Sequence, residues 1–132
     1  MNPIPVVAAV ILDDSKRVLI AQRKETDSQG GLWEFPGGKL KASESPEQCL
    51  IREIKEELGL SITVGRIFSA VNHAYSDKSI LLLAYHCKIA GGTVRLKEHQ
   101  NAKWVEIGEL LNFNLSAADI PVAKKLIKEA AQ

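Results

Sequence analysis

Apolar residues gather in short runs along the first half of the chain, and turn-forming residues separate them. A continuous apolar run occupies residues 6–12, and a second run, which ends in Gln22 and Arg23, occupies 18–23; Asp13-Asp14-Ser15-Lys16 lies between them. Runs of this length predict two strands joined as a hairpin. The same pattern predicts further strands at 32–35, 62–71, 79–89 and 102–105.

The clearest helix prediction follows Ser45. This serine supplies a capping hydroxyl, Pro46 suits the first helical position and Gln48 suits the third. Gly59 is the matching stop signal. At about 100° of rotation per residue, one side of the helix is apolar and should face the core. That side comprises Leu50, Ile51, Ile54 and Leu58.

Two more helical segments are predicted near the end of the chain, a short one around 108–111 and a longer one at about 120–131. Strands followed by helices that can cover both faces fit an α/β fold, with a mixed β-sheet in an α/β/α sandwich. We expect residues 1–132 to form a single domain, since this length suffices for a substantial core.

The other side of the helix after Ser45 is acidic. Glu53, Glu56 and Glu57 share one stripe. Two carboxylates roughly 6 Å apart would repel by about 3 kcal/mol at an effective dielectric near 20. A hard divalent cation would remove this repulsion, so a metal site is the leading hypothesis. Taken alone, the cluster fits a solvated helix face equally well, partly neutralised by Arg52 and Lys55.

A longer pattern contains this stripe. Gly38 is followed after five residues by Glu44, and after seven more by Arg-Glu-Ile-Lys-Glu-Glu-Leu-Gly-Leu at 52–60. This pattern resembles the signature of the Nudix hydrolases at every fixed position. The run Trp-Glu-Phe-Pro-Gly-Gly-Lys at 33–39 is similar to the MutT branch, which includes 8-oxo-dGTP and CTP pyrophosphohydrolases. The resemblance extends from about Val6 to the C-terminal helix.

The resemblance implies Mg²⁺ as the cofactor, with Mn²⁺ as a substitute. Glu57 would be the central ligand and Arg52 would orient Glu53. Glu44 would be an outer-shell or second-metal residue. The full set of implied metal residues is Gly37, Gly38, Glu44, Glu53, Glu56, Glu57 and Glu98.

Glu98 matches a distant acidic residue of MutT-like enzymes, which implies a role as general base or metal ligand. Its alternative is an exposed loop glutamate. The implied catalytic set is Arg52, Glu53, Glu56, Glu57 and Glu98.

The candidate substrate-binding residues combine cations for phosphate with groups suited to a base. Arg23 could bind a phosphate through two hydrogen bonds, as similar sequences imply, or simply shield apolar surface at a strand end. Asp119 stands where many MutT-like sequences carry asparagine. An ionised aspartate only accepts hydrogen bonds, which weakens the case for strict 8-oxoguanine recognition, and Asp119 could instead cap a helix. The set comprises Arg23, Phe35, Lys39, Tyr75, Lys78 and Asp119.

The activity implied is Mg²⁺-dependent hydrolysis of a nucleoside triphosphate to a monophosphate and pyrophosphate, with attack favoured at the β phosphorus. A broad range including 8-oxo-dGTP would serve nucleotide-pool sanitation. The alternatives are a (d)CTP-preferring enzyme, a hydrolase of another nucleoside diphosphate derivative, and a non-catalytic damaged-base recognition module. The four carboxylates Glu44, Glu53, Glu56 and Glu57 favour a catalyst over the module.

Composition limits the partners. The formal charge of +1 without a long basic run gives no support to a nucleic-acid partner, which leaves free nucleoside triphosphates. Residues 1–5 lack the features of a secretory signal and no apolar run reaches membrane-spanning length, so we expect a cytoplasmic protein without a membrane partner. Cys49 and Cys87 should be free thiols. A monomer and a homodimer both remain open.

Overall fold

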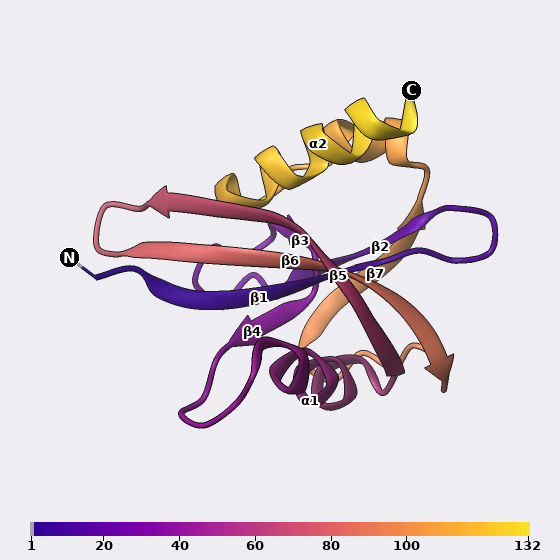
Figure 1. Cartoon of the computed structure of the whole chain (residues 1–132). Coiled ribbons are helices and arrows are strands. Elements are labelled where there is room, and N and C mark those ends of the chain that lie inside the picture. The colour runs from indigo at the N-terminus through magenta and orange to yellow at the C-terminus, as the bar shows by residue number, and fades with distance from the viewer. Residues whose placement is uncertain (1) are drawn as a thin grey trace.

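Two β-sheets form the middle of the molecule, with helix α1 (Pro46–Leu58) on one side and helix α2 (Ile120–Ala130) on the other (Figure 1). The computed structural model describes residues 2–132, so Met1, part of the N-terminal segment considered for a leader, lies outside the described residues. The arrangement of helices around a mixed sheet confirms the predicted α/β/α sandwich.

The larger sheet has four strands in the order β4 (Gly37–Lys39), β1 (Ile4–Ile11), β6 (Ser79–Gly91) and β5 (Ser61–Ala74). β1 runs parallel to β6 and antiparallel to β4, and β5 runs antiparallel to β6. The sheet is therefore mixed, as predicted. The strand β4 was not predicted, because two of its three residues are glycines, which have little strand propensity.

The smaller sheet is antiparallel and has the order β3 (Trp33–Glu34), β2 (Val18–Arg23) and β7 (His99–Val105). The predicted hairpin between the first two strands is therefore wrong. The chain does turn after β1, but only the Leu12–Val18 bridge pairs the two segments. Because β4 and β6 already occupy both edges of β1, β2 pairs elsewhere.

The core has two parts, one on each face of β1. Val7, Ala9 and Ile11 pack toward α1, whereas Ala8 and Val10 belong to the cluster that contains the apolar residues of α2. This strand is buried on both faces, which explains its continuous apolar run. The segment before α2 contains two short 3₁₀ helices, Ile107–Asn112 and Ala117–Asp119.

Local sequence signals position α1. The Ser45 hydroxyl accepts a hydrogen bond from the Gln48 amide at 3.1 Å, and the Gln48 side chain accepts one from the Ser45 amide at 2.9 Å. Gly59 ends the helix with φ +70° and donates to the Lys55 carbonyl. These predictions are confirmed. The expected burial of Ile51 is wrong, since it is 46% exposed, and Glu57 lies in the buried face instead.

Two further findings concern the expected environment. No helix among residues 2–132 is long and apolar enough to cross a bilayer. Cys49 and Cys87 are both buried free thiols, as predicted. Burial raises the pKa of the Cys49 thiol to about 11 and that of Cys87 to about 12, so neither is a reactive thiolate.

Replacing Ser45 with alanine should lower the free energy of unfolding by about 1 kcal/mol, because the Gln48 amide loses its capping acceptor. Urea denaturation measures this change. The exposed Ser76, in the turn between β5 and β6, provides a control whose replacement by alanine should cost less than about 0.5 kcal/mol. Equal losses in the two variants would contradict the capping role.

Candidate active site

The last turn of α1 places a carboxylate in the interior. Glu57 is only 7% exposed. Burial, followed by the nearby carboxylates of Glu53, Glu34 and Glu98, raises the pKa of Glu57 to about 10. A negative charge here would therefore require a cation close by.

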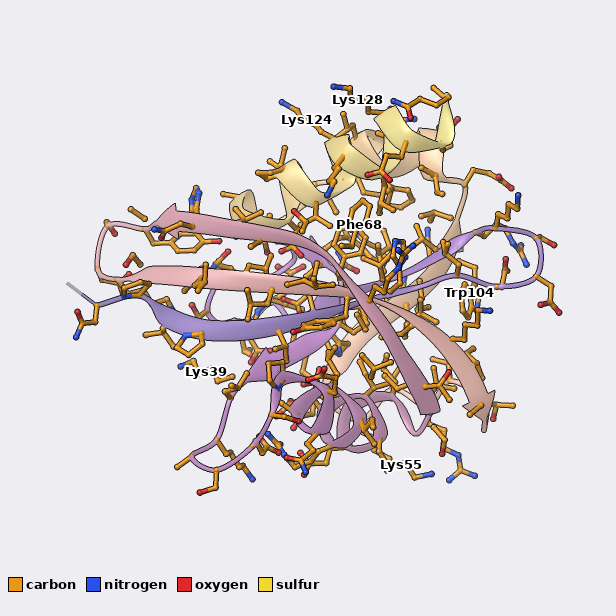
Figure 2. All side chains as sticks on the ribbon, viewed as in Figure 1. Lys39, Lys55, Phe68, Trp104, Lys124 and Lys128 are labelled. Carbon is orange, nitrogen blue, oxygen red and sulfur yellow. The ribbon has the colours of Figure 1, made fainter. Side chains whose placement is uncertain are left out.

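Arg52 hydrogen-bonds to Glu44, which precedes α1, and to two carboxylates of the helix. Its guanidinium binds Glu44 through two nitrogens at 2.6 and 2.9 Å, Glu53 at 2.6 Å and Glu56 at 3.2 Å. The Arg52 hydrogen bonds hold the pKa of Glu44 down at about 2. Lys55 instead projects away from the sheets (Figure 2). Arg52 thus neutralises part of the acidic stripe, as the alternative of a solvated face required, and Glu57 meets these groups only through the neighbouring Glu53 carboxyl.

Two residues from the smaller sheet complete the surroundings of Glu57. The ring of His99, at the start of β7, lies with Nε2 2.9 Å from a Glu34 oxygen and Nδ1 3.7 Å from a Glu57 oxygen. Arg23 approaches the other Glu34 oxygen at 3.4 Å. The order β3, β2, β7 brings these side chains together around the end of β2.

Glu57 opens onto a polar cavity of about 410 Å³. Glu98, an exposed residue, lies on its wall. Three basic residues, Arg23, Lys24 and Lys97, also line it. The mixture of cations and carboxylates, one of them buried, suits a polyphosphate together with a metal ion.

A second cavity, of about 270 Å³, adjoins the first and shares Arg23, Glu34, Gly37 and Gly38 with it. Apolar side chains such as Ile80 and Leu82 form part of its wall. All the predicted substrate-binding residues lie here, namely Arg23, Phe35, Lys39, Tyr75, Lys78 and Asp119. A chamber whose wall combines apolar and polar side chains suits a nucleobase.

Asp119 is a buried acid at this second cavity, 6% exposed. Its side chain makes no cap for α2, so that alternative is wrong; instead Oδ1 accepts a hydrogen bond from the Phe35 amide at 3.2 Å. Burial, with the nearby Glu34 charge, raises the pKa of Asp119 well above its ordinary value. The raised pKa favours the neutral carboxyl, which can donate a hydrogen bond as well as accept one.

The remaining candidates have distinct places. Tyr75 reaches the segment before α2, where its hydroxyl accepts a hydrogen bond from the Ala118 amide at 3.3 Å, and its ring stacks edge-on with His73. Phe35 is buried in the core and contributes its amide to Asp119. Glu56, with a side chain 54% exposed, and Glu44 lie outside the walls of both cavities.

Sequence reasoning missed Glu34 and His99, as well as the cations Lys24 and Lys97. The strand predicted at 32–35 contains Glu34 without a role for it, and the strand predicted at 102–105 leaves out His99, which begins β7. Their positions depend on the pairing of β2 with both β3 and β7, which the sequence pattern did not reveal. This pairing places Ala21 opposite Glu34 and Arg23 opposite His99.

The residues present fit a divalent cation. Ligand atoms of Glu34, Glu57 and His99 lie within 4.8 Å of one another, and His99 Nδ1 is buried without a hydrogen-bond partner among residues 2–132. Such an orphaned atom beside a buried carboxylate is unfavourable without a positive charge. The site therefore has the donors that a metal-dependent hydrolase of phosphate anhydrides requires.

Comparison with known proteins agrees with this class. The chain matches the family model described as NUDIX domain over residues 7–125. It is 43% identical over 122 residues to the CTP pyrophosphohydrolase of Escherichia coli K12, covering 92% of this chain and 90% of the relative. It is 27% identical over 126 residues to the 8-oxo-dGTP diphosphatase of the same strain, covering 96% and 98%.

Solved structures show the same relationship. The solution structure of the E. coli ORF135 protein has a TM-score of 0.85 at 40% identity and covers 99% of this chain and 93% of that one. A MutT protein from Methanosarcina mazei Go1 gives 0.89 at 27% identity, covering 99% and 98%. The chain belongs to the Nudix family and is a MutT-like Nudix hydrolase. Its family implies a divalent metal and a nucleotide substrate.

Glycine is needed at two adjacent positions for different reasons. A methyl group on Gly38 would collide with the Glu53 carboxylate, whereas one on Gly37 would collide with the Val7 backbone carbonyl. Gly38→Ala should therefore keep its stability but bind the divalent metal about tenfold more weakly. Gly37→Ala should lose roughly 1–3 kcal/mol of stability. Calorimetric titration measures the metal affinity of each variant, and urea denaturation measures its stability. Parental metal affinity in Gly38→Ala would contradict the predicted effect of Gly38 on metal binding.

Glu57 should make the stability of the metal-free protein depend on pH. Its carboxyl stays protonated in the folded state up to about pH 10 but ionises near 4.5 when unfolded. Between these values the folded state binds more protons, so the free energy of unfolding falls as pH rises. Glu57→Gln removes this dependence and should gain at least about 1 kcal/mol over the parent between about pH 5.5 and 8.

Urea denaturation in the presence of a chelator measures this difference. Glu47→Gln, an exposed change of the same type on the same helix, is the control and should follow the parent. Parallel pH profiles for the parent and Glu57→Gln would show that Glu57 is not protonated in the folded protein.

Proposed function

We propose that this enzyme hydrolyses nucleoside triphosphates to the monophosphate and pyrophosphate, with Mg²⁺ as its ion and Mn²⁺ as a substitute. One observation carries the proposal: the buried Glu57 carboxylate opens onto a cavity with three basic residues, and a chamber suited to a base adjoins it. Free nucleotides in the cytoplasm would be its substrates, and sanitation of the nucleotide pool would be its role.

Glu53, Glu56, Glu57 and the carbonyl of Gly37 or Gly38 would hold the metal. When bound, the ion would neutralise charge on the phosphate oxygens as the anhydride bond breaks. Arg52 fixes the Glu53 carboxylate at 2.6 Å and is itself fixed by Glu44, which supports positioning roles for both residues.

Glu98 is the proposed general base. Its place on the cavity wall allows it to accept a proton from a water molecule that attacks the phosphate chain. Arg23, Lys24 and Lys97 would bind the phosphate oxygens from the same cavity. In this arrangement no covalent enzyme intermediate is needed.

Base recognition is assigned to Asp119, with Tyr75 and Lys78 on the wall of the same chamber. One oxygen of Asp119 is held by the Phe35 amide, which leaves the other for the base. A neutral carboxyl can pair with a cytosine edge or with a guanine edge. We therefore propose a range that includes 8-oxo-dGTP as well as CTP and dCTP. The name of the 43% identical relative favours a preference for cytosine nucleotides as the second candidate.

A nucleotide panel tests this proposal. Purified enzyme with Mg²⁺ should release pyrophosphate from CTP, dCTP and 8-oxo-dGTP. Glu57→Gln should reduce turnover roughly a hundredfold or more, because replacement of groups that merely support a metal ligand already costs about ten- to a hundredfold. Glu47→Gln should retain parental turnover.

Pyrophosphate and monophosphate are measured separately in ¹⁸O-water. Label in pyrophosphate would support attack at the β phosphorus, and label only in the monophosphate would move the attack to the α phosphorus. Failure to turn over any of the three nucleotides would reject the substrate assignment.

A further inference from the structure

His99 has an unusual environment for a histidine. It begins β7 opposite Arg23, and its side chain is only 5% exposed. Nδ1 is the one buried side-chain nitrogen or oxygen among residues 2–132 that lacks a hydrogen-bond partner. A buried polar atom of this kind calls for a partner that the protein chain itself does not supply.

Glu34 determines which ring nitrogen carries the hydrogen. A carboxylate oxygen accepts hydrogen bonds, so Nε2, 2.9 Å from Glu34 Oε2, donates. The neutral ring then leaves a lone pair on Nδ1. Arg23 binds the other oxygen of Glu34 at 3.4 Å, which helps to keep this carboxylate in place. Glu34 therefore fixes the orientation of the His99 ring through Nε2, on the side of the ring away from Nδ1.

The lone pair faces the acidic helix. Nδ1 lies 3.7 Å from Glu57 Oε1, too far for a hydrogen bond. Two ligands bound to one ion at about 2.1 Å each lie roughly 3 Å apart at right angles and about 4.2 Å apart on opposite sides. The observed separation falls between these limits. Both residues line the same 410 Å³ cavity, so an ion can enter.

We infer that Nδ1 of His99 is a nitrogen ligand of the divalent cation at Glu57, and that Glu34 orients the ring as its carboxylate partner. This inference rests on the proposed function, because the ion is the one proposed there. Metal-bound histidines usually donate their second ring nitrogen to a carboxylate, which is the arrangement of His99 and Glu34. A nitrogen donor favours Mn²⁺ over Mg²⁺, since Mg²⁺ prefers oxygen ligands.

Pulsed electron paramagnetic resonance of bound Mn²⁺ tests the contact directly. The parent protein should show coupling between Mn²⁺ and a nitrogen nucleus, and labelling the histidines with ¹⁵N should change its frequency. The chain has three histidines, so His73→Gln and His86→Gln serve as matched controls that should retain the coupling. His99→Gln should lose it.

Calorimetry provides the second measurement. His99→Gln should bind Mn²⁺ about tenfold more weakly than the parent and lose much less affinity for Mg²⁺. The preference for Mn²⁺ over Mg²⁺ therefore falls in this variant alone. If His99→Gln does not fold, the double variant His73→Gln/His86→Gln decides, because any histidine coupling left in it comes from His99.

Bound Mn²⁺ without nitrogen coupling in the parent overturns the inference, as does coupling that survives in His99→Gln or disappears in the double control. Absence of Mn²⁺ binding overturns it together with the metal part of the proposed function. Nitrogen coupling in an enzyme that releases no pyrophosphate would leave the ligand assignment standing and reject the proposed function alone.

Discussion

The rest of the site depends on the burial of one carboxylate. Glu57 belongs to the face of α1 that packs on the sheets, where an apolar residue would be expected, and it is surrounded by other acids. A charge in this position is unfavourable unless a cation compensates it. Glu57 lines the polar cavity, so the residue that most needs a compensating cation lies where an ion can reach it.

Two different arrangements of charge therefore lie along a single helix. Arg52 hydrogen-bonds to Glu44, Glu53 and Glu56 from one guanidinium near the middle of α1, which compensates part of their negative charge. Glu57, in the last turn of α1, lies beside Glu53 and faces the smaller sheet. This difference explains how a dense acidic stripe can exist in a stable fold and still offer a strong site for a cation.

Sequence patterns predicted those features that depend on neighbours in the chain. Ser45 and Gly59 bound α1 because capping involves residues three or four positions apart. The places of Glu34 and His99 were not predictable, since they depend on β2 pairing with two distant strands. Asp119 shows the same limit: a cap and a buried acid look alike locally, and an amide 84 residues away decides between them.

The wall shared by the two cavities has an evolutionary consequence. Arg23 and Glu34 line both chambers, and Glu34 also holds the ring of His99 beside Glu57. If the proposed function holds, a mutation there would alter base selection and bond cleavage at once, so selection should keep these residues fixed. Tyr75 and Lys78, which line only the base chamber, are free of that coupling. Divergence toward new nucleotides should therefore accumulate at the tip of the β5–β6 hairpin.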